Sequence, residues 1–167
     1  MGDYPPEVKS RAIDNLKLFL PTKWAALKRS DELTKSVDEL MRSSKTWLAG
    51  MQLIAAAQLV DRASRLEGIA IKPEDAEIRT AAICTLGQLH SPKAVEILVR
   101  LTDRGGHLVE VAQALGQQTN GRGSRQAMDA LLKLLKSDQA DVALAAVSGL
   151  TGSRAGSDAL LKMKEKN

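Results

Sequence analysis

An apolar pattern of eight residues recurs three times in the second half of the chain, and no other feature constrains the fold as strongly. It spans residues 94–101, returns at 127–134 and returns again at 156–163. The copies are spaced 33 and 29 residues apart. A period of this size is typical of stacked helical units, none of which can bury its apolar face alone. The sequence therefore predicts helix pairs that pack on one another in series.

Each copy follows a second segment of helical character. Residues 82–87 and 111–116 both end in Leu-Gly, and residues 146–151 are a looser match. No convincing alternation of polar and apolar residues is present, so we expect no sheet. Aromatic residues make up only 2% of the chain, and a core of smaller aliphatic side chains suits closely packed helices. Each unit thus reads as helix A, a short turn and helix B.

Polar residues mark the expected helix starts. Ser91 and Pro92 fit the cap and the first position of the first B helix. Ser124 is expected to cap the second B helix, and Asp138 the third A helix. One leucine from each of the six helices is expected in the core: Leu86, Leu98, Leu115, Leu131, Leu150 and Leu160. Stacking of one B helix on the next is expected to bury three more residues: Val99, Leu132 and Leu161.

These features resemble HEAT-like repeats. The resemblance rests on the Leu-Gly ending of helix A, the Ser91-Pro92 turn and the run at 94–101, and it covers about residues 74–165. It implies an all-α fold, an α-solenoid of stacked antiparallel helix pairs with about ten helices and a concave surface. Residues 150–161 also look like repeats found beside haem-binding modules in large exported bacterial proteins, but the Cys-x-x-Cys-His haem-attachment signature is absent.

The first part of the chain is helical but does not follow the repeat. We expect residues 1–72 to be diverged helices that cap the solenoid, because an end unit must cover apolar surface on one side and face water on the other. Residues 73–167 should form three repeats in one continuous domain, beginning at Pro73 and Glu74. Four N-terminal helices are expected: residues 6–20, a short helix with Trp24 and Leu27, one that begins at Asp31, and a long apolar helix from Ser44 to Gly68.

The composition argues against several kinds of site. The single cysteine excludes an internal disulfide and a cysteine-based metal cluster, and Cys84 is expected to be a buried structural thiol. Neither His90 nor His107 has another ligand at metal spacing, so we expect no metal and no cofactor. The most apolar run, residues 47–60, is too short to cross a bilayer, so we expect no membrane insertion.

The start of the chain has no apolar core of a signal peptide. We expect a cytoplasmic protein if these residues are the whole chain, and an exported one if they are a piece of a larger protein. Neither the oligomeric state nor the identity of a partner follows from the sequence.

Acid–base pairs recur on the B helices and are the main candidate binding residues. Each acidic residue lies four positions before a basic one, opposite the apolar stripe: Glu96 and Arg100, Asp129 and Lys133, Asp158 and Lys162. One interpretation is a charged ladder on the inner surface of the solenoid; the other is a set of solvated pairs that stabilise their own helices. The glycine-rich loop 119–125 adds Arg122 and Arg125, which could hold an anion at a helix N-terminus or lie in a plain surface loop.

Three functions remain open at this point. A non-enzymatic module that binds a protein or peptide fits best, because the charged surface comes without a nucleophile, a base or a metal set. Nucleic-acid binding is the alternative, since basic residues of the B helices could line a groove, but the net charge of +4 is spread along the chain and aromatic platforms are lacking. An enzyme on a HEAT-like scaffold, such as a bilin lyase or a base-excision glycosylase, is the third.

Overall fold

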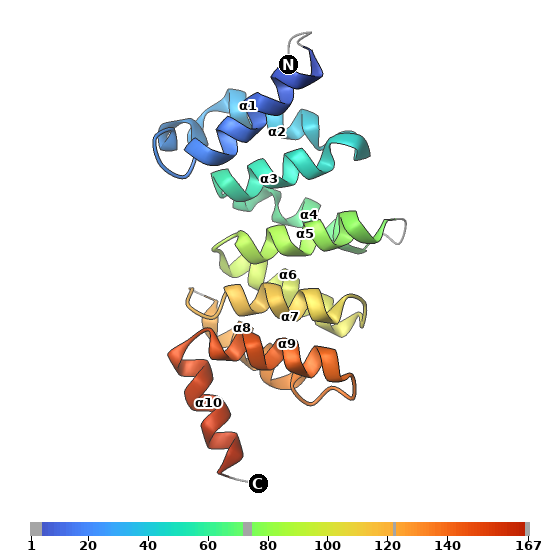
Figure 1. Ribbon diagram of the computed structural model, residues 1–167, viewed down its shortest axis with the longest axis vertical. Helices are drawn as coiled ribbons and strands as arrows, with labels where there is room; N and C mark the ends of the chain where they lie inside the picture. Colours follow the sequence, from blue (N-terminus) through green and yellow to red (C-terminus); the bar gives the residue numbers. More distant parts are fainter. Residues whose placement is uncertain (1–4, 72–74, 122, 166–167) are drawn as a thin grey trace. The chain divides into compact units, whose positions relative to one another are not determined.

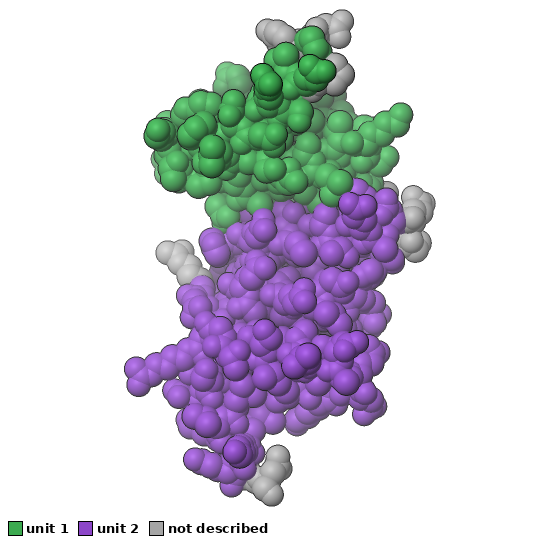
Figure 2. Space-filling view, in the orientation of Figure 1, with its two compact units in different colours: residues 1–62 green, residues 63–167 purple. Residues whose placement is uncertain are grey.

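The computed structural model describes residues 5–71, 75–121 and 123–165, and within them it contains ten α-helices and no strand (Figure 1). The predicted all-α fold is therefore confirmed. The chain divides into two compact units, Met1–Arg62 and Ala63–Asn167 (Figure 2). The expected division into residues 1–72 and 73–167 stays a prediction, and its first repeat residues, Pro73 and Glu74, lie outside the described residues.

The first unit holds three α-helices joined by short 3₁₀ turns. Its elements are α1 (Pro6–Phe19), η1 (Ala25–Arg29), α2 (Asp31–Leu40), η2 (Ser44–Thr46), α3 (Trp47–Ala57) and η3 (Val60–Arg62). Both α1 and α2 pack against α3. The predicted starts at Pro6 and Asp31 are confirmed, and the Ser30 hydroxyl caps α2 by accepting a hydrogen bond from the Leu33 N–H. Buried side chains of this small core include Leu20, Val37 and Met51.

The expected single long helix from Ser44 to Gly68 is wrong. Helix α3 ends at Ala57, and Gln58 adopts a left-handed backbone with φ of 57°. The Gln58 side-chain amide donates to the Ala55 carbonyl at 2.9 Å, which satisfies one of the free groups at the helix end. A new helix, α4 (Ala63–Ile71), follows, and Gly68 lies inside it. Neither glycine nor proline occurs at Gln58, so the sequence has no residue there that would signal the end of a helix.

The second unit is a double row of stacked helices. They are α4 (Ala63–Ile71), α5 (Ala76–Gln88), α6 (Pro92–Asp103), α7 (Leu108–Gln117), α8 (Ser124–Leu134), α9 (Ala140–Thr151) and α10 (Arg154–Lys164). One row consists of α5, α7 and α9, each packed on the next, and the other consists of α4, α6 and α8 (Figure 1). The predicted series of helix pairs is thus confirmed as α5 with α6, α7 with α8, and α9 with α10.

Glycines allow the first row to pack closely. A Cβ added at Gly87 would lie 2.8 Å from the Cα of Ala114, and one added at Gly116 would lie 2.7 Å from the Cα of Gly149. Neither distance leaves room for a side chain, since non-bonded carbons prefer about 3.5–4.0 Å. The recurring Leu-Gly ending therefore has a physical reason: the leucine fills the core, and the glycine lets the next A helix approach.

Most of the expected core is confirmed. Five of the six predicted leucines are fully buried: Leu86, Leu98, Leu115, Leu131 and Leu150. Leu160 is only partly buried, and Leu161 is 61% exposed, so both predictions are wrong. The reason is that α10 packs mainly on α9 and does not continue the row of α4, α6 and α8. Val99 and Leu132 are half-buried rather than buried, because their positions lie at the edge between the apolar and charged faces of the B helices.

One predicted cap is confirmed and two are displaced by a residue. The Ser91 hydroxyl accepts a hydrogen bond from the Ala94 N–H, and Pro92 is the first residue of α6. Ser124 is the first residue of α8 rather than its cap, and the cap position is taken by Gly123. A Cβ added at Gly123 would lie 2.6 Å from the buried Val95 side chain, so a larger residue at this position would require Val95 to shift.

The other displaced cap precedes α9. Gln139, not Asp138, occupies the cap position, and its side chain makes no capping hydrogen bond. Two caps of the second unit were not expected from the sequence. The Asp75 carboxylate accepts hydrogen bonds from the first turn of α5, and the Ser153 hydroxyl accepts one from the Gly156 N–H of α10. Each satisfies a backbone donor that the helix itself leaves free.

Candidate functional site

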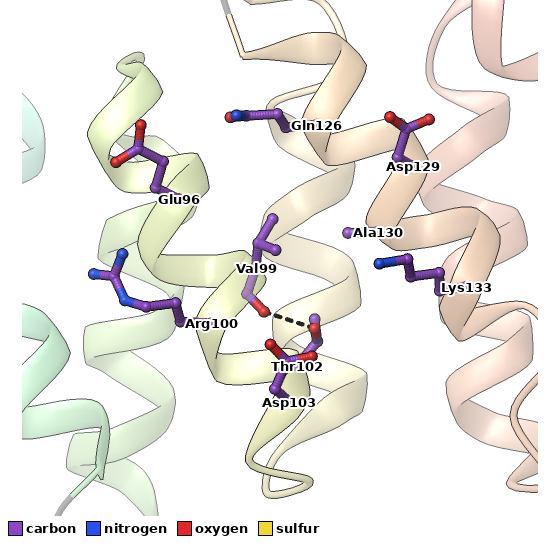
Figure 3. Close-up of a pocket in the computed structure, with 9 residues that line it drawn as sticks. All are labelled: Glu96, Val99, Arg100, Thr102, Asp103, Gln126, Asp129, Ala130 and Lys133. Atoms are coloured by element: carbon purple, nitrogen blue, oxygen red, sulfur yellow. Dashed lines mark hydrogen bonds between the residues drawn. The ribbon is translucent and has the colours of Figure 1, made fainter.

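A groove of about 390 Å³ lies between α6 and α8 in the second unit (Figure 3). We call it the α6–α8 groove. Side chains from only these two helices line it: Glu96, Val99, Arg100, Thr102, Asp103, Gln126, Asp129, Ala130 and Lys133. More than half of these residues are charged, although more of the lining surface is apolar than polar.

Helical periodicity explains why these charges meet in one place. On α6 the apolar stripe that contains Ile97 and Leu98 is buried, and the charged residues on the other side face solvent. Glu96, Arg100 and Asp103 follow one another at spacings of four and three, so they lie on one stripe of the helix surface. Because α6 and α8 pack side by side, the repeat places the equivalent residues of α8 beside them.

The charges are arranged in levels across the groove. Glu96 of α6 and Asp129 of α8 are equivalent in the repeat and form an acidic level (Figure 3). Arg100 and Lys133 form a basic level one turn further along, about 6 Å away for four residues of α-helix. Asp103 follows three residues later on α6 and lines the same groove.

Arg100 is held by a residue that the sequence did not single out. Its Nε and Nη2 atoms donate to the two carboxylate oxygens of Glu67 on α4, at 3.0 and 2.8 Å. Such a bidentate pair fixes the plane of the guanidinium. The hydrogen bonds from Arg100 lower the pKa of Glu67, against the opposing effect of its partial burial.

The ion pairs expected between residues four positions apart on the same helix do not form. Among the described residues, no ion pair joins Glu96 to Arg100 or Asp129 to Lys133. Glu96 still attracts Arg100 through its charge, so both interpretations of these residues stay open. The acidic level and Lys133 remain exposed to solvent, where a partner could contact them.

The floor of the groove is apolar. Ala130 is buried at 5% exposure, and Val99 is half-buried. The Thr102 hydroxyl donates to the Val99 carbonyl at 2.6 Å, which turns its polar atom away from the groove floor (Figure 3). A side chain entering the groove would therefore meet aliphatic surface below and charge on both walls.

The groove contains four of the eight candidate binding residues, and three others lie outside it. Glu96, Arg100, Asp129 and Lys133 line the groove, whereas Asp158, Lys162 and Arg125 do not. Asp158 and Lys162 are exposed on α10, which packs on α9. Arg125 is exposed in the first turn of α8, and Arg122 lies outside the described residues.

Polar residues near the glycine-rich loop tie neighbouring repeats together. The buried Gln118 side-chain amide donates to the Leu89 carbonyl at 2.9 Å, just beyond the end of α5. The Asn120 side-chain amide donates to the Gly152 carbonyl at 3.2 Å, just beyond the end of α9. These hydrogen bonds join the end of α7 to the ends of α5 and α9, which is a structural role. They give no support to an anion site in the loop.

Sequence reasoning missed Glu67, although the repeat contains the signal for it. Glu67 lies 33 residues before Arg100, which itself lies 33 residues before Lys133. Extending the repeat one period upstream would have placed α4 in the same row as α6 and α8. The diverged apolar residues of α4 obscured this relationship. Asp103, Thr102 and Gln126 were missed because they have no counterpart in the acid–base pattern.

Other candidate chemistry is limited in the described part of the chain. Cys84 is half-buried rather than buried, and burial, followed by the charge of Glu110, raises the pKa of its thiol. Within residues 5–71, 75–121 and 123–165, no group of three or more His, Cys, Asp or Glu residues is placed to hold a metal ion. In the same residues no helix combines the length and the apolar character that spanning a membrane requires.

Comparison with known proteins identifies the repeat. A family profile described as PBS lyase HEAT-like repeat matches residues 78–104, which contain most of α5 and all of α6. No curated protein and no solved structure matches the chain. The likeness to repeats of exported haem-associated proteins stays a prediction. The match coincides with the helix pair that carries the Leu-Gly ending, the Ser-Pro cap and one wall of the groove. This pair is therefore similar to a HEAT-like repeat, and it lies within an all-α fold of stacked helix pairs.

Proposed function

We propose that the second unit is a protein-interaction module that acts without catalysis and binds its partner in the α6–α8 groove. The observation that carries this proposal is the arrangement of charged residues in levels around an apolar floor. These residues form no ion pairs within their own helices. A stacked helical repeat supplies the support, because it holds such a surface rigid over successive units. Complementary charge then selects the partner and fixes its register.

The groove favours a protein partner over a nucleic acid. Its lining carries three carboxylates and two basic groups, and Arg100 is already paired with Glu67. A phosphate backbone would face more negative than positive charge here, whereas nucleic-acid binding depends on the neutralisation of phosphates by basic residues. Binding of nucleic acid elsewhere on the chain stays an alternative, which an anisotropy titration with duplex DNA at low salt would test.

The groove also lacks the chemistry of a hydrolytic site. Its lining residues provide carboxylates, an ammonium, a guanidinium, an amide and the Thr102 hydroxyl, but no histidine or cysteine. The hydroxyl is engaged with the Val99 carbonyl, so it is not paired with a base that could activate it. A non-enzymatic role is the proposal that these residues support.

A peptide-display selection against the whole chain tests this function. Selected peptides should bind the native protein and lose about tenfold in affinity with Lys133→Glu, because the reversed charge repels the group that Lys133 attracts. Lys162→Glu on α10 is the matched control, since it makes the same change outside the groove. Both variants should melt within about 2 °C of the native protein. Equal losses with the two variants, or selected peptides that ignore both, would contradict the proposal.

A further inference from the structure

We infer that the α6–α8 groove receives an amphipathic helix that carries a basic, an acidic and a second basic residue one turn apart on one face. This inference rests on the proposed function and specifies the partner for the same groove. It follows from the spacing of the charges along the groove, from their order, and from the floor between them.

The spacing favours a helix over an extended peptide. Asp103 lies seven residues after Glu96 on α6, with Arg100 between them, and this separation corresponds to about 10.5 Å along the helix. A partner helix that runs along the groove repeats this spacing with residues i, i+4 and i+7, which share one face. Same-face residues of an extended chain are about 6.6–6.8 Å apart, so its third residue would lie about 13.4 Å along. That residue would lie about 3 Å beyond Asp103, so a helix matches the spacing of the charges more closely than an extended chain does.

The order of the charges gives the order of the partner's residues. Glu96 and Asp129 place carboxylates on both walls of the groove, so the partner helix needs a basic residue at this level. The level of Arg100 and Lys133 calls for an acidic residue, and Asp103 calls for a second basic one. A partner with the opposite order would place like charges together at all three points, which is unfavourable for association.

Lys133 is the main contact at the middle level. The Arg100 guanidinium uses two of its five N–H donors on Glu67, so it keeps three and remains a secondary contact. Lys133 is exposed and belongs to no ion pair of the described residues. Removing Lys133 should therefore weaken binding more than removing Arg100, although both lie at the same level.

The floor requires one apolar residue on the same face of the partner. Val99 and Ala130 lie between the charged walls, at the level between the first and second charges of α6. A small or medium apolar side chain at position i+3 of the partner helix would cover them. Helices that bind in grooves commonly use residues i, i+3, i+4 and i+7 in this way.

Four labelled peptides of matched composition test the inference by fluorescence anisotropy with the whole chain. The first has the basic–acidic–basic order, the second the acidic–basic–acidic order, the third the same charges spaced two residues apart, and the fourth a central proline in the first sequence. The first should bind at least about tenfold more tightly than the second and third, because attractive contacts become repulsive or are lost. The proline peptide should lose a similar factor, because proline breaks the helix.

A charge swap tests the contact itself. The Lys133→Glu variant should bind the first peptide more weakly than the native protein does. Changing the central acidic residue of this peptide to lysine should restore part of its affinity for the variant. Equal binding of the reversed-order or proline peptide would overturn the inference. If display-selected peptides still depend on Lys133 in that case, the groove remains a binding site and only the helical pattern is wrong. If selected peptides also fail to depend on Lys133, the proposed function fails with it.

Discussion

Replacing Gly116 by alanine should destabilise the second unit, even though alanine is the better helix former. The added Cβ would lie 2.7 Å from the Cα of Gly149, where α7 meets α9. Carbon atoms prefer about 3.5–4.0 Å, so the two helices would have to separate by about 1 Å. The atom in the way belongs to backbone and cannot rotate aside as a flexible side chain would.

The magnitude follows from two opposing terms. Alanine gains about 1 kcal/mol over glycine inside a helix. Overpacking a well-packed core costs about 1–3 kcal/mol, and the upper end applies here because α7 is packed between α5 and α9 and the neighbouring Leu115 is fully buried. We expect a net loss of about 2 kcal/mol, which lowers Tm by about 4–8 °C in a chain of this length.

Gly68→Ala is the matched control. Gly68 is also inside a helix, but a Cβ added there meets nothing within 4 Å. Only the helix-propensity gain applies, so this variant should be more stable by about 0.5–1 kcal/mol. Thermal and urea unfolding followed by circular dichroism would measure both variants. If Gly116→Ala raises Tm as Gly68→Ala does, the close approach of α7 and α9 is refuted.

Three further outcomes follow from the packing and the electrostatics. Leu131→Ala should cost about 2–5 kcal/mol in urea unfolding, whereas Leu161→Ala should cost less than about 0.5 kcal/mol because Leu161 is 61% exposed. Hydrogen bonds from Arg100 lower the pKa of Glu67, so this carboxylate stabilises the fold above the ordinary value of 4.5 and ceases to do so as pH falls through the lowered value. Glu67→Gln should accordingly lower Tm at pH 7 and have a vanishing effect as pH falls well below 4.5; an equal effect at both pH values would contradict the assignment. Burial raises the pKa of Cys84, so at pH 8 its alkylation should be at least about tenfold slower in the native protein than in guanidinium, and equal rates would show that the thiol is accessible.

Local features of the sequence were sufficient for the repeats themselves. The Leu-Gly endings, the Ser91-Pro92 start and the apolar run after it each act within one helix or one turn, and the structure has a helix pair where they predict it. Leu98 and Leu131 are buried because they lie on the apolar stripe of an amphipathic helix, whatever that helix packs against. These are the properties that helical periodicity alone can predict.

The sequence predicts which charged residues of the candidate site lie side by side, but it does not predict the ion-pair partner of Arg100. The repeat places Glu96 beside Asp129 and Arg100 beside Lys133, and an alignment of the copies is enough to expect this. The partner of Arg100 was not predictable from spacing within one helix, since Glu67 competes from the neighbouring α4 and offers two carboxylate oxygens in bidentate geometry. Contacts between helices decide which of two nearby carboxylates an arginine contacts.

The sequence by itself determined an all-helical chain, the positions of its regular pairs and most of its buried leucines, because these depend on periodicity and on residues that begin or end helices. Only the tertiary structure decided where the apolar run breaks at Gln58, that α10 leaves the row of B helices, and that Leu161 faces solvent. The tertiary structure also decided that two of three charged pairs share a groove. The physical reason is that the periodicity of an α-helix is the same in every context. Which residues meet across two helices depends instead on the distance and the crossing angle between those helices.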